Sequence, residues 1–189
     1  MNSTFTFATG EPFHASELTD SLLSIHTDLS AYLDSLAPTT FFARIGDAWS
    51  PAENARHLIK SMRPIVLAMK APRIVLAVLF GISVRPSRDF ARIRAAYREQ
   101  LALGGKAGRF APSLEGQPAA PLARRKEIMT ALHDVLNDLV LAAQPWSERA
   151  LDRYRLPHPL LGKLTVREML MFTVYHNSHH AINLRTRLS

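Results

Sequence analysis

The sequence predicts an all-α protein: a four-helix bundle with a helical insertion between the second and third long helices. Four long segments repeat apolar residues at three- and four-residue steps, the spacing that lines one face of a helix. Two of these segments begin with a capping box, which marks a helix N-terminus. The chain contains no internal repeat, low-complexity tract or domain linker. Residues 1–189 are therefore predicted to form a single domain, with the insertion at roughly 71–121.

The first long helix is predicted over residues 17–37, with Ser16 as its N-cap and Pro38 ending it. His26 lies at the edge of its apolar seam. It could line a buried site, but a histidine at the boundary of the core is the commoner case. The seam residues are Leu18, Leu22, Ile25, Leu29, Tyr32 and Leu36.

The second helix is predicted over residues 51–69 and has a strong start. Ser50 is the N-cap, Pro51 occupies the first helical position, where no amide is needed, and Glu53 closes a capping box. His57 lies near this N-terminus, beside the apolar row. That row consists of Leu58, Met62, Ile65 and Met69.

The insertion begins with an almost wholly apolar run at residues 74–84. This run is too short to span a bilayer, which needs about 20 residues. Pro72 and Gly81 bracket a predicted short buried helix, although the β-branched residues of the run leave a strand as the alternative. An exposed version of the run would suit a subunit interface.

A further helix of the insertion is predicted from Pro86 to about Leu103, followed by a long loop rich in glycine and proline at residues 104–121. Such loops are commonly lids or flexible connections. The apolar side of the helix consists of Phe90, Ile93, Tyr97 and Leu101.

The third and fourth long helices are predicted over residues 122–143 and 165–189, joined by a linking segment. Thr165 and Glu168 form the capping box of the last helix. The seam of the third helix consists of Ile128, Leu132, Val135, Leu139 and Ala142.

The composition excludes several kinds of site. Apolar residues make up 47% and charged residues 21%, which is ordinary for a soluble globular protein. The chain has no cysteine, which excludes disulfides, thiolate ligands and cysteine nucleophiles, so any metal must be held by nitrogen and oxygen. Met1 to Gly10 has no basic residue and no long apolar core, so we expect no signal peptide, no membrane association and a cytoplasmic protein.

The net charge is +7, and much of the excess lies at residues 85–109. A basic patch can bind nucleic acid, but exposed aromatic residues do not alternate with these charges. A solvated helix face is therefore the favoured interpretation, and nucleic-acid binding is disfavoured. The same charges would suit a substrate that bears a carboxylate or phosphate.

Two histidines of the last helix form the central candidate site. His176 and His180 are four residues apart, so both imidazoles project from one face, the face that carries the apolar stripe. Together with His57 from a facing helix they can form a site of three nitrogen ligands. Three neutral imidazoles suit Zn, Ni, Fe or Cu and leave at least one position open. Metal in such a site can acidify water or a thiol or polarise a carbonyl.

Two other residues of this helix are secondary candidates. Asn183 lies one turn past His180 and could hydrogen-bond a ligand or the substrate. His179 is rotated by about 100° from His180 and ranks below it as a ligand.

Three segments together resemble the DinB-like (DinB/YfiT) superfamily: residues 49–58 (WSPAENARHL), 164–170 (LTVREML) and 175–180 (YHNSHH). The resemblance implies a four-helix bundle whose divalent metal is held by His57, His176 and His180, with zinc or nickel expected. It also implies homodimers and, in members of known activity, metal-dependent thiol transfer or hydrolysis. Many relatives have glutamine or arginine where this chain has Asn183, so the substrate is not implied by the resemblance.

Two functions follow as hypotheses. The first is a metal-dependent enzyme that transfers a low-molecular-weight thiol to a small electrophile or hydrolyses a small substrate. The alternative is a non-catalytic dimeric binding or stress-response protein whose metal is structural.

Overall fold

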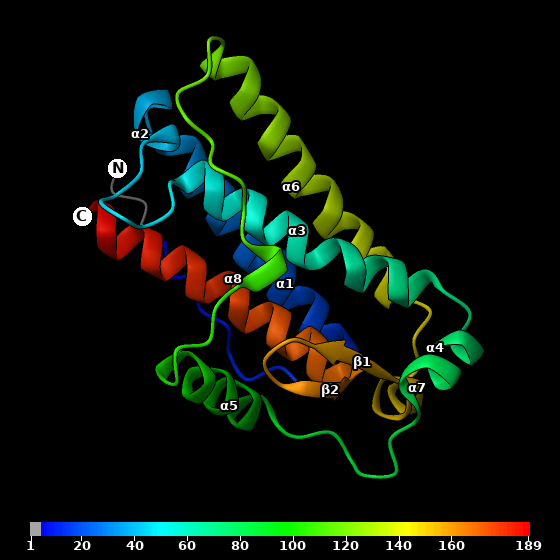
Figure 1. Cartoon of the computed structure of the whole chain (residues 1–189). Helices are drawn as coiled ribbons and strands as arrows, with labels where there is room; N and C mark the ends of the chain where they lie inside the picture. The colour runs from blue at the N-terminus through cyan, green and yellow to red at the C-terminus, as the bar shows by residue number, and fades with distance from the viewer. Residues whose placement is uncertain (1–4) are drawn as a thin grey trace.

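The structure is a computed structural model and describes residues 5–189 (Figure 1). The elements in chain order are α1 (Ala15–Ser35), α2 (Pro38–Phe42), α3 (Pro51–Lys70), α4 (Arg73–Phe80), α5 (Phe90–Ala102), the 3-10 helix η1 (Gly108–Phe110), α6 (Pro121–Ala143), α7 (Glu148–Arg153), β1 (Arg155–His158), β2 (Gly162–Thr165) and α8 (Val166–Leu188).

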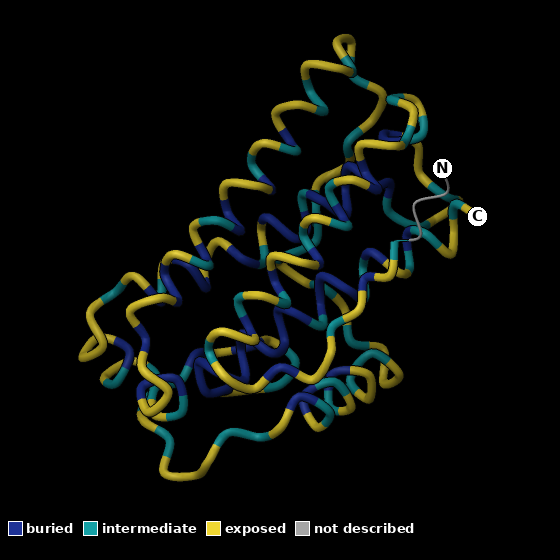
Figure 2. Tube along the Cα trace, turned by 180° about the vertical axis from the view of Figure 1, so that it is seen from behind, coloured by how far each residue is buried: buried dark blue, intermediate teal, exposed yellow. Residues whose placement is uncertain are grey.

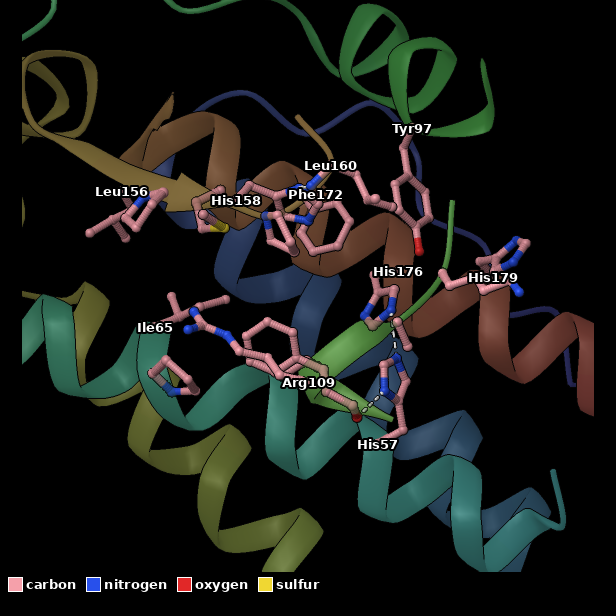
Figure 3. Close-up of a pocket in the computed structure, with 18 of the residues that line it drawn as sticks. His57, Ile65, Tyr97, Arg109, Leu156, His158, Leu160, Phe172, His176 and His179 are labelled. Atoms are coloured by element: carbon pink, nitrogen blue, oxygen red, sulfur yellow. Dashed lines mark hydrogen bonds between the residues drawn. The ribbon is translucent and has the colours of Figure 1, made fainter. Parts of the chain in front are cut away.

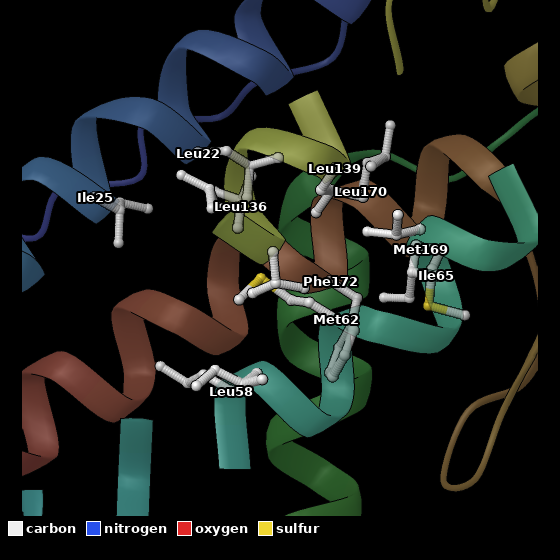
Figure 4. Close-up of a cluster of buried hydrophobic side chains, with 14 of the residues drawn as sticks. Leu22, Ile25, Leu58, Met62, Ile65, Leu136, Leu139, Met169, Leu170 and Phe172 are labelled. Carbon is white, nitrogen blue, oxygen red and sulfur yellow. The ribbon is translucent and has the colours of Figure 1, made fainter. Parts of the chain in front are cut away.

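The four long helices α1, α3, α6 and α8 form the predicted bundle. Helix α3 packs on α6, and α1 packs on both α6 and α8. Their apolar stripes meet in one core, to which each of the four helices contributes buried side chains (Figure 4). Buried residues follow the inner faces of the helices, whereas the outer faces and most loops are exposed (Figure 2). The predicted seams therefore form the core, except that Leu36 is only half-buried.

The two predicted capping boxes are confirmed. The Ser50 backbone amide donates to Glu53 Oε2 at 2.9 Å, and the Glu53 amide donates to Ser50 Oγ at 3.1 Å. The Thr165 amide donates to Glu168 Oε2 at 3.1 Å. Each pair satisfies backbone donors that have no partner within the helix.

The start of α1 differs from the prediction. The helix begins at Ala15, and Ser16 lies inside it instead of capping it. The Glu17 carboxylate accepts the backbone amides of Phe13 and His14 at 2.8 and 3.0 Å. A carboxylate in the first turn thus fixes the N-terminus two residues before the expected boundary.

The insertion is helical, as predicted. Its first helix, α4, was predicted to be buried, and this prediction is wrong. In α4 only Leu76 is buried, because no other element of residues 5–189 covers its outer face. The apolar run is therefore largely exposed. Its exposed members are Ile74, Val75, Val78, Leu79, Ile82 and Val84.

Helix α5 begins at Phe90, later than the predicted start at Pro86. The Asp89 side chain caps it by accepting the Arg92 amide at 2.8 Å. Residues Phe90, Ile93 and Tyr97 are buried, and the helix packs along α8. The insertion thus adds a wall to one side of the last bundle helix (Figure 1).

The connections contain structure that the periodicity did not predict. Residues 38–50 include the short helix α2, and residues 145–165 include α7 and an antiparallel hairpin of β1 with β2. In the hairpin Leu156 pairs with Leu164, and both are buried. Strands of four residues are too short for an alternating pattern to identify them. The hairpin ends at Thr165, so it leads directly into the N-cap of α8.

Part of the basic segment has a structural role. Arg85 and Arg88 form ion pairs at 2.6 and 3.0 Å with the carboxylate of Glu168, whose side chain is fully buried. Burial alone would raise the pKa of Glu168, but the hydrogen bonds from the two arginines outweigh it and lower the pKa to about 2. The capping carboxylate of α8 is therefore ionised and anchors the insertion to the bundle.

Within residues 5–189, no helix is both long enough and apolar enough to cross a membrane.

Candidate metal centre

Three imidazoles from two helices meet on one side of the bundle. His57 comes from the first two turns of α3, and His176 and His180 come from α8. One nitrogen from each ring lies within 4.8 Å of the others, and the ring centroids are 4.7 to 5.0 Å apart. The Nε2 atoms of His57 and His176 are 3.1 Å apart (Figure 3).

A backbone carbonyl fixes the tautomer of His57. Its Nδ1 lies 2.9 Å from the carbonyl oxygen of Phe110 in η1 (Figure 3). A carbonyl oxygen can only accept, so Nδ1 carries the hydrogen. In the neutral ring the lone pair is then on Nε2, which faces the other two histidines.

Asn54 fixes the tautomer of His180 in the same way. The Asn54 amide nitrogen donates to the carbonyl oxygens of Trp49 and Ser50 at 3.1 and 3.0 Å, which sets the orientation of the amide. Its oxygen Oδ1 lies 2.7 Å from His180 Nδ1 and accepts from it. The Nε2 lone pair of His180 is therefore also free. Ligand histidines in metal sites are commonly oriented by a hydrogen bond of this kind.

The surroundings keep the three rings neutral. Desolvation lowers the pKa of His176 and of His180 well below the usual range, and neighbouring histidines add to the effect. Burial also lowers the pKa of His57, and the hydrogen bond to Phe110 offsets only part of this. An imidazole must be neutral to bind a metal, so all three rings are in the binding form near neutral pH.

These features fit a divalent metal ion. Two nitrogens bound to one tetrahedral zinc at about 2.0–2.1 Å would lie about 3.3 Å apart, close to the separation of the His57 and His176 Nε2 atoms. The Nε2 lone pairs of His57 and His180 lie close to an imidazole nitrogen of His176, which can also bind a metal in the neutral ring. His57, His176 and His180 can therefore hold a metal ion.

The three histidines stand in the wall of a cavity of about 400 Å³. Helix α3, η1, α5, the hairpin and α8 all contribute to its lining, which is mostly apolar. Trp49 stacks on the His180 ring at 6.3 Å, and Phe172 stacks on the His176 ring at 5.0 Å. The centre is thus supported from within the core and open toward the cavity.

The remaining candidates lie outside the three-histidine cluster. His179 lines the cavity but points away from His57 and His176 (Figure 3). Asn183 Nδ2 lies 2.9 Å from His179 Nε2, so its hydrogen bond supports His179 and not one of the three clustered rings. His26 pairs with His133 across α1 and α6, at 3.3 Å between ring nitrogens, and lies at the edge of the core as expected.

Sequence reasoning did not assign three groups at this site: Asn54, the Phe110 carbonyl and His158. Asn54 precedes His57 by one helical turn, so its position on the same face was a usable signal. The other two lie in the short 3-10 helix η1 and in the hairpin, where no periodicity places a residue. His158 Nδ1 accepts the backbone amides of Leu160 and Leu161 at 3.2 and 3.0 Å.

A family model described as the DinB superfamily matches residues 21–182, which include all three histidines. The chain belongs to the DinB superfamily. A solved structure titled "Crystal structure of TT2238, a four-helix bundle protein" is similar to this DinB-superfamily chain, with a TM-score of 0.57 and 18% identity. The match covers 92% of this chain and 99% of that one and supports the four-helix bundle fold. A comparison with curated proteins found no match.

The hydrogen bond from His180 to Asn54 leads to a prediction for this DinB-superfamily chain. Replacing Asn54 by alanine should weaken metal affinity by about 10–100-fold, because His180 loses the group that orients it. Competition with a chromophoric chelator measures the affinity. Asn183→Ala is the matched control and should leave the affinity unchanged, since Asn183 contacts His179. Equal effects of the two substitutions would contradict the assignment.

Proposed function

We propose that this protein is a metal-dependent enzyme that transfers a low-molecular-weight thiol to a small electrophile or hydrolyses a small substrate. His57, His176 and His180 would hold the divalent metal, and zinc or nickel is the expected ion. The observation that carries the proposal is the position of these histidines in the wall of a cavity. Structural metal sites are closed by protein ligands, whereas catalytic sites keep a position open for a substrate.

A divalent ion at this position would lower the pKa of a thiol or of water and would polarise an electrophile. The contribution of the chain is to position and desolvate. The Phe110 carbonyl and Asn54 hold two imidazoles in the required tautomers. The apolar lining strengthens electrostatic interactions with a bound molecule because it excludes water. The volume of about 400 Å³ suits a small molecule.

Activity assays with and without metal test the proposal. Protein prepared without an affinity tag is freed of metal by a chelator and reloaded with zinc or nickel. Thiol transfer is followed with a panel of small thiols and a chromogenic aryl halide, and hydrolysis with a chromogenic ester. Turnover should require the metal and should be lost in His176→Ala. Turnover that survives in the metal-free protein, or none for any reaction pair, would contradict the enzymatic proposal.

The alternative is a non-catalytic dimeric binding or stress-response protein with a structural metal. The exposed apolar surface at α4 supports one element of this alternative, the formation of a dimer. Six apolar residues of α4 and of the stretch just after it, at positions 74–84, are exposed, and Val78 and Val84 are 76% and 95% exposed. Exposed apolar patches of this kind commonly form interfaces. Homodimer formation through α4 is therefore proposed for either function.

Val78→Asp tests the dimer. The wild-type protein should sediment as a dimer and the variant as a monomer, because a charge in an apolar interface is desolvated without a partner. Leu114→Asp is the control, since Leu114 is 74% exposed but lies outside α4. A monomeric wild-type protein would contradict this proposal and leave the metal centre unaffected.

A further inference from the structure

Tyr97 is a buried residue whose hydroxyl group is not hydrogen-bonded to any described residue. The residue is 7% exposed and comes from α5, in the insertion. Its ring packs against Phe172 at 5.0 Å between centroids. Within residues 5–189 its hydroxyl group forms no hydrogen bond to the protein, and it is not among the fully buried unpaired atoms, so it is accessible from the cavity that Tyr97 lines. A phenol that faces a cavity can donate its hydrogen to a molecule bound there.

The hydroxyl group points into the cavity, toward the three-histidine centre. Figure 3 shows the Tyr97 side chain descending from α5 with its oxygen directed toward His176 and His179. The Tyr97 ring lies 6.0 Å from the His176 ring, between centroids. Helices α3 and α8 supply the histidines, and α5 supplies a hydroxyl group on the facing wall. A molecule bound beside the histidines would lie within reach of this hydroxyl.

A second donor lies on the same side of the cavity. His158 Nδ1 accepts two backbone amides, so its hydrogen is on Nε2. His158 is 9% exposed and lines the cavity, and its ring centroid lies 6.2 Å from that of Tyr97. Two elements other than the four bundle helices, α5 and the hairpin, thus each contribute an N–H or O–H donor.

The charges of the lining have one sign. Lys106 and Arg109 line the cavity, and among residues 5–189 no aspartate or glutamate does. The Arg109 side chain extends along the cavity toward Ile65, away from His57 (Figure 3). Donors and cations without a carboxylate favour a ligand that accepts hydrogen bonds and carries negative charge.

We propose that Tyr97 contacts the substrate and donates its hydroxyl hydrogen to an anionic group, a thiolate or a carboxylate, bound beside His57, His176 and His180. This rests on the proposed metal centre and adds a substrate class and a residue to it. The hydrogen bond would favour the anionic form of the group and orient it. The apolar walls would receive the body of the molecule.

Cobalt-substituted protein tests this without an assay of activity. The visible spectrum of Co²⁺ in the site reports both its coordination and the binding of added acetate or 2-mercaptoethanol, used as separate probes. Tyr97→Phe should bind Co²⁺ as tightly as the wild type but at least one probe about tenfold more weakly, the loss expected for a hydrogen bond to a charged group. Tyr97→Leu should show the same loss if the hydroxyl group, and not the ring, is responsible.

Tyr175→Phe is the matched control, because Tyr175 neighbours Tyr97 at 6.1 Å but does not line the cavity. It should leave the affinity for both probes unchanged. The probe that responds identifies a thiolate or a carboxylate. Normal Co²⁺ binding with unchanged probe affinities in Tyr97→Phe would overturn the role of Tyr97 alone. Failure of the wild type to bind Co²⁺ would overturn the metal centre, and this proposal with it.

Discussion

Replacing His176 by alanine should abolish stoichiometric metal binding. The bound metal should fall from about one equivalent to below about a tenth, a larger effect than the 10–100-fold expected for a residue that only orients a ligand. His176 is buried, and its Nε2 lies opposite that of His57. Its removal leaves two imidazoles, one from each helix, which cannot complete a three-nitrogen site. Elemental analysis of protein purified without an affinity tag measures the effect.

The neighbouring His179 supplies the control. His179→Ala removes an imidazole from the same helix and the same cavity but not from the three-histidine cluster. It should retain about one metal equivalent, as three ligands remain. If the wild type and His176→Ala contained the same sub-stoichiometric amount of metal, the metal proposal would be wrong. Loss of metal in both variants would show that the ligand set is wrongly assigned.

Replacing Glu168 by alanine should lower the free energy of unfolding by about 3 kcal/mol, among the largest expected effects of a single substitution. Its buried carboxylate accepts hydrogen bonds from Arg85 and Arg88 and caps α8. The substitution would remove the ion pairs that hold the insertion on the bundle. It would also leave the Thr165 backbone amide, at the N-cap of α8, without its hydrogen-bond acceptor. Urea denaturation followed by circular dichroism gives the difference.

Glu127→Ala is the matched control for Glu168→Ala. Glu127 also pairs with an arginine, Arg124, but is 65% exposed. Exposed pairs contribute about 0–1 kcal/mol, so the expected change is small. If both substitutions changed the free energy of unfolding equally, the buried ion pairs would have no special role.

The lowered pKa of Glu168 also predicts a pH dependence. The group titrates near 4.5 in the unfolded chain and at about 2 in the folded protein, so its stabilising effect is complete above pH 4.5. The effect is lost as the pH falls toward 2, because the Glu168 carboxylate binds a proton more tightly in the unfolded chain than in the folded protein. The stability difference between wild type and Glu168→Gln should therefore be constant above about pH 5 and shrink below it.

The bundle could be predicted from the sequence because its signals are local. Apolar residues at helical spacing identify the four seams, and the boxes at Ser50 and Thr165 mark two of the helix starts. The spacing of His176 and His180 likewise places both on one face. That His57 completes the cluster depends on how α3 packs against α8. Its place beside the apolar row of a facing helix made it a candidate, and the family resemblance implied the same three ligands.

The remaining features depend on tertiary contacts that spacing does not specify. The apolar run of α4 is exposed because nothing among the described residues covers it, whereas an apolar run by itself indicates only a preference for burial. Tyr97 belongs to the predicted apolar row of its helix, and its ring is buried as expected. The direction of its hydroxyl group follows from the packing of α5 on α8. The hairpin that carries His158 is too short to be recognised by alternation.

A crystal structure of the metal-loaded protein, with anomalous diffraction recorded at the absorption edge of the metal, tests the central claim most directly. We predict one anomalous peak per chain, bound by nitrogens of His57, His176 and His180 at about 2.0–2.1 Å if the metal is zinc. We also predict a further position that faces the cavity and holds an exchangeable ligand. A peak elsewhere, or a metal fully enclosed by four protein ligands, would contradict the proposed catalytic centre.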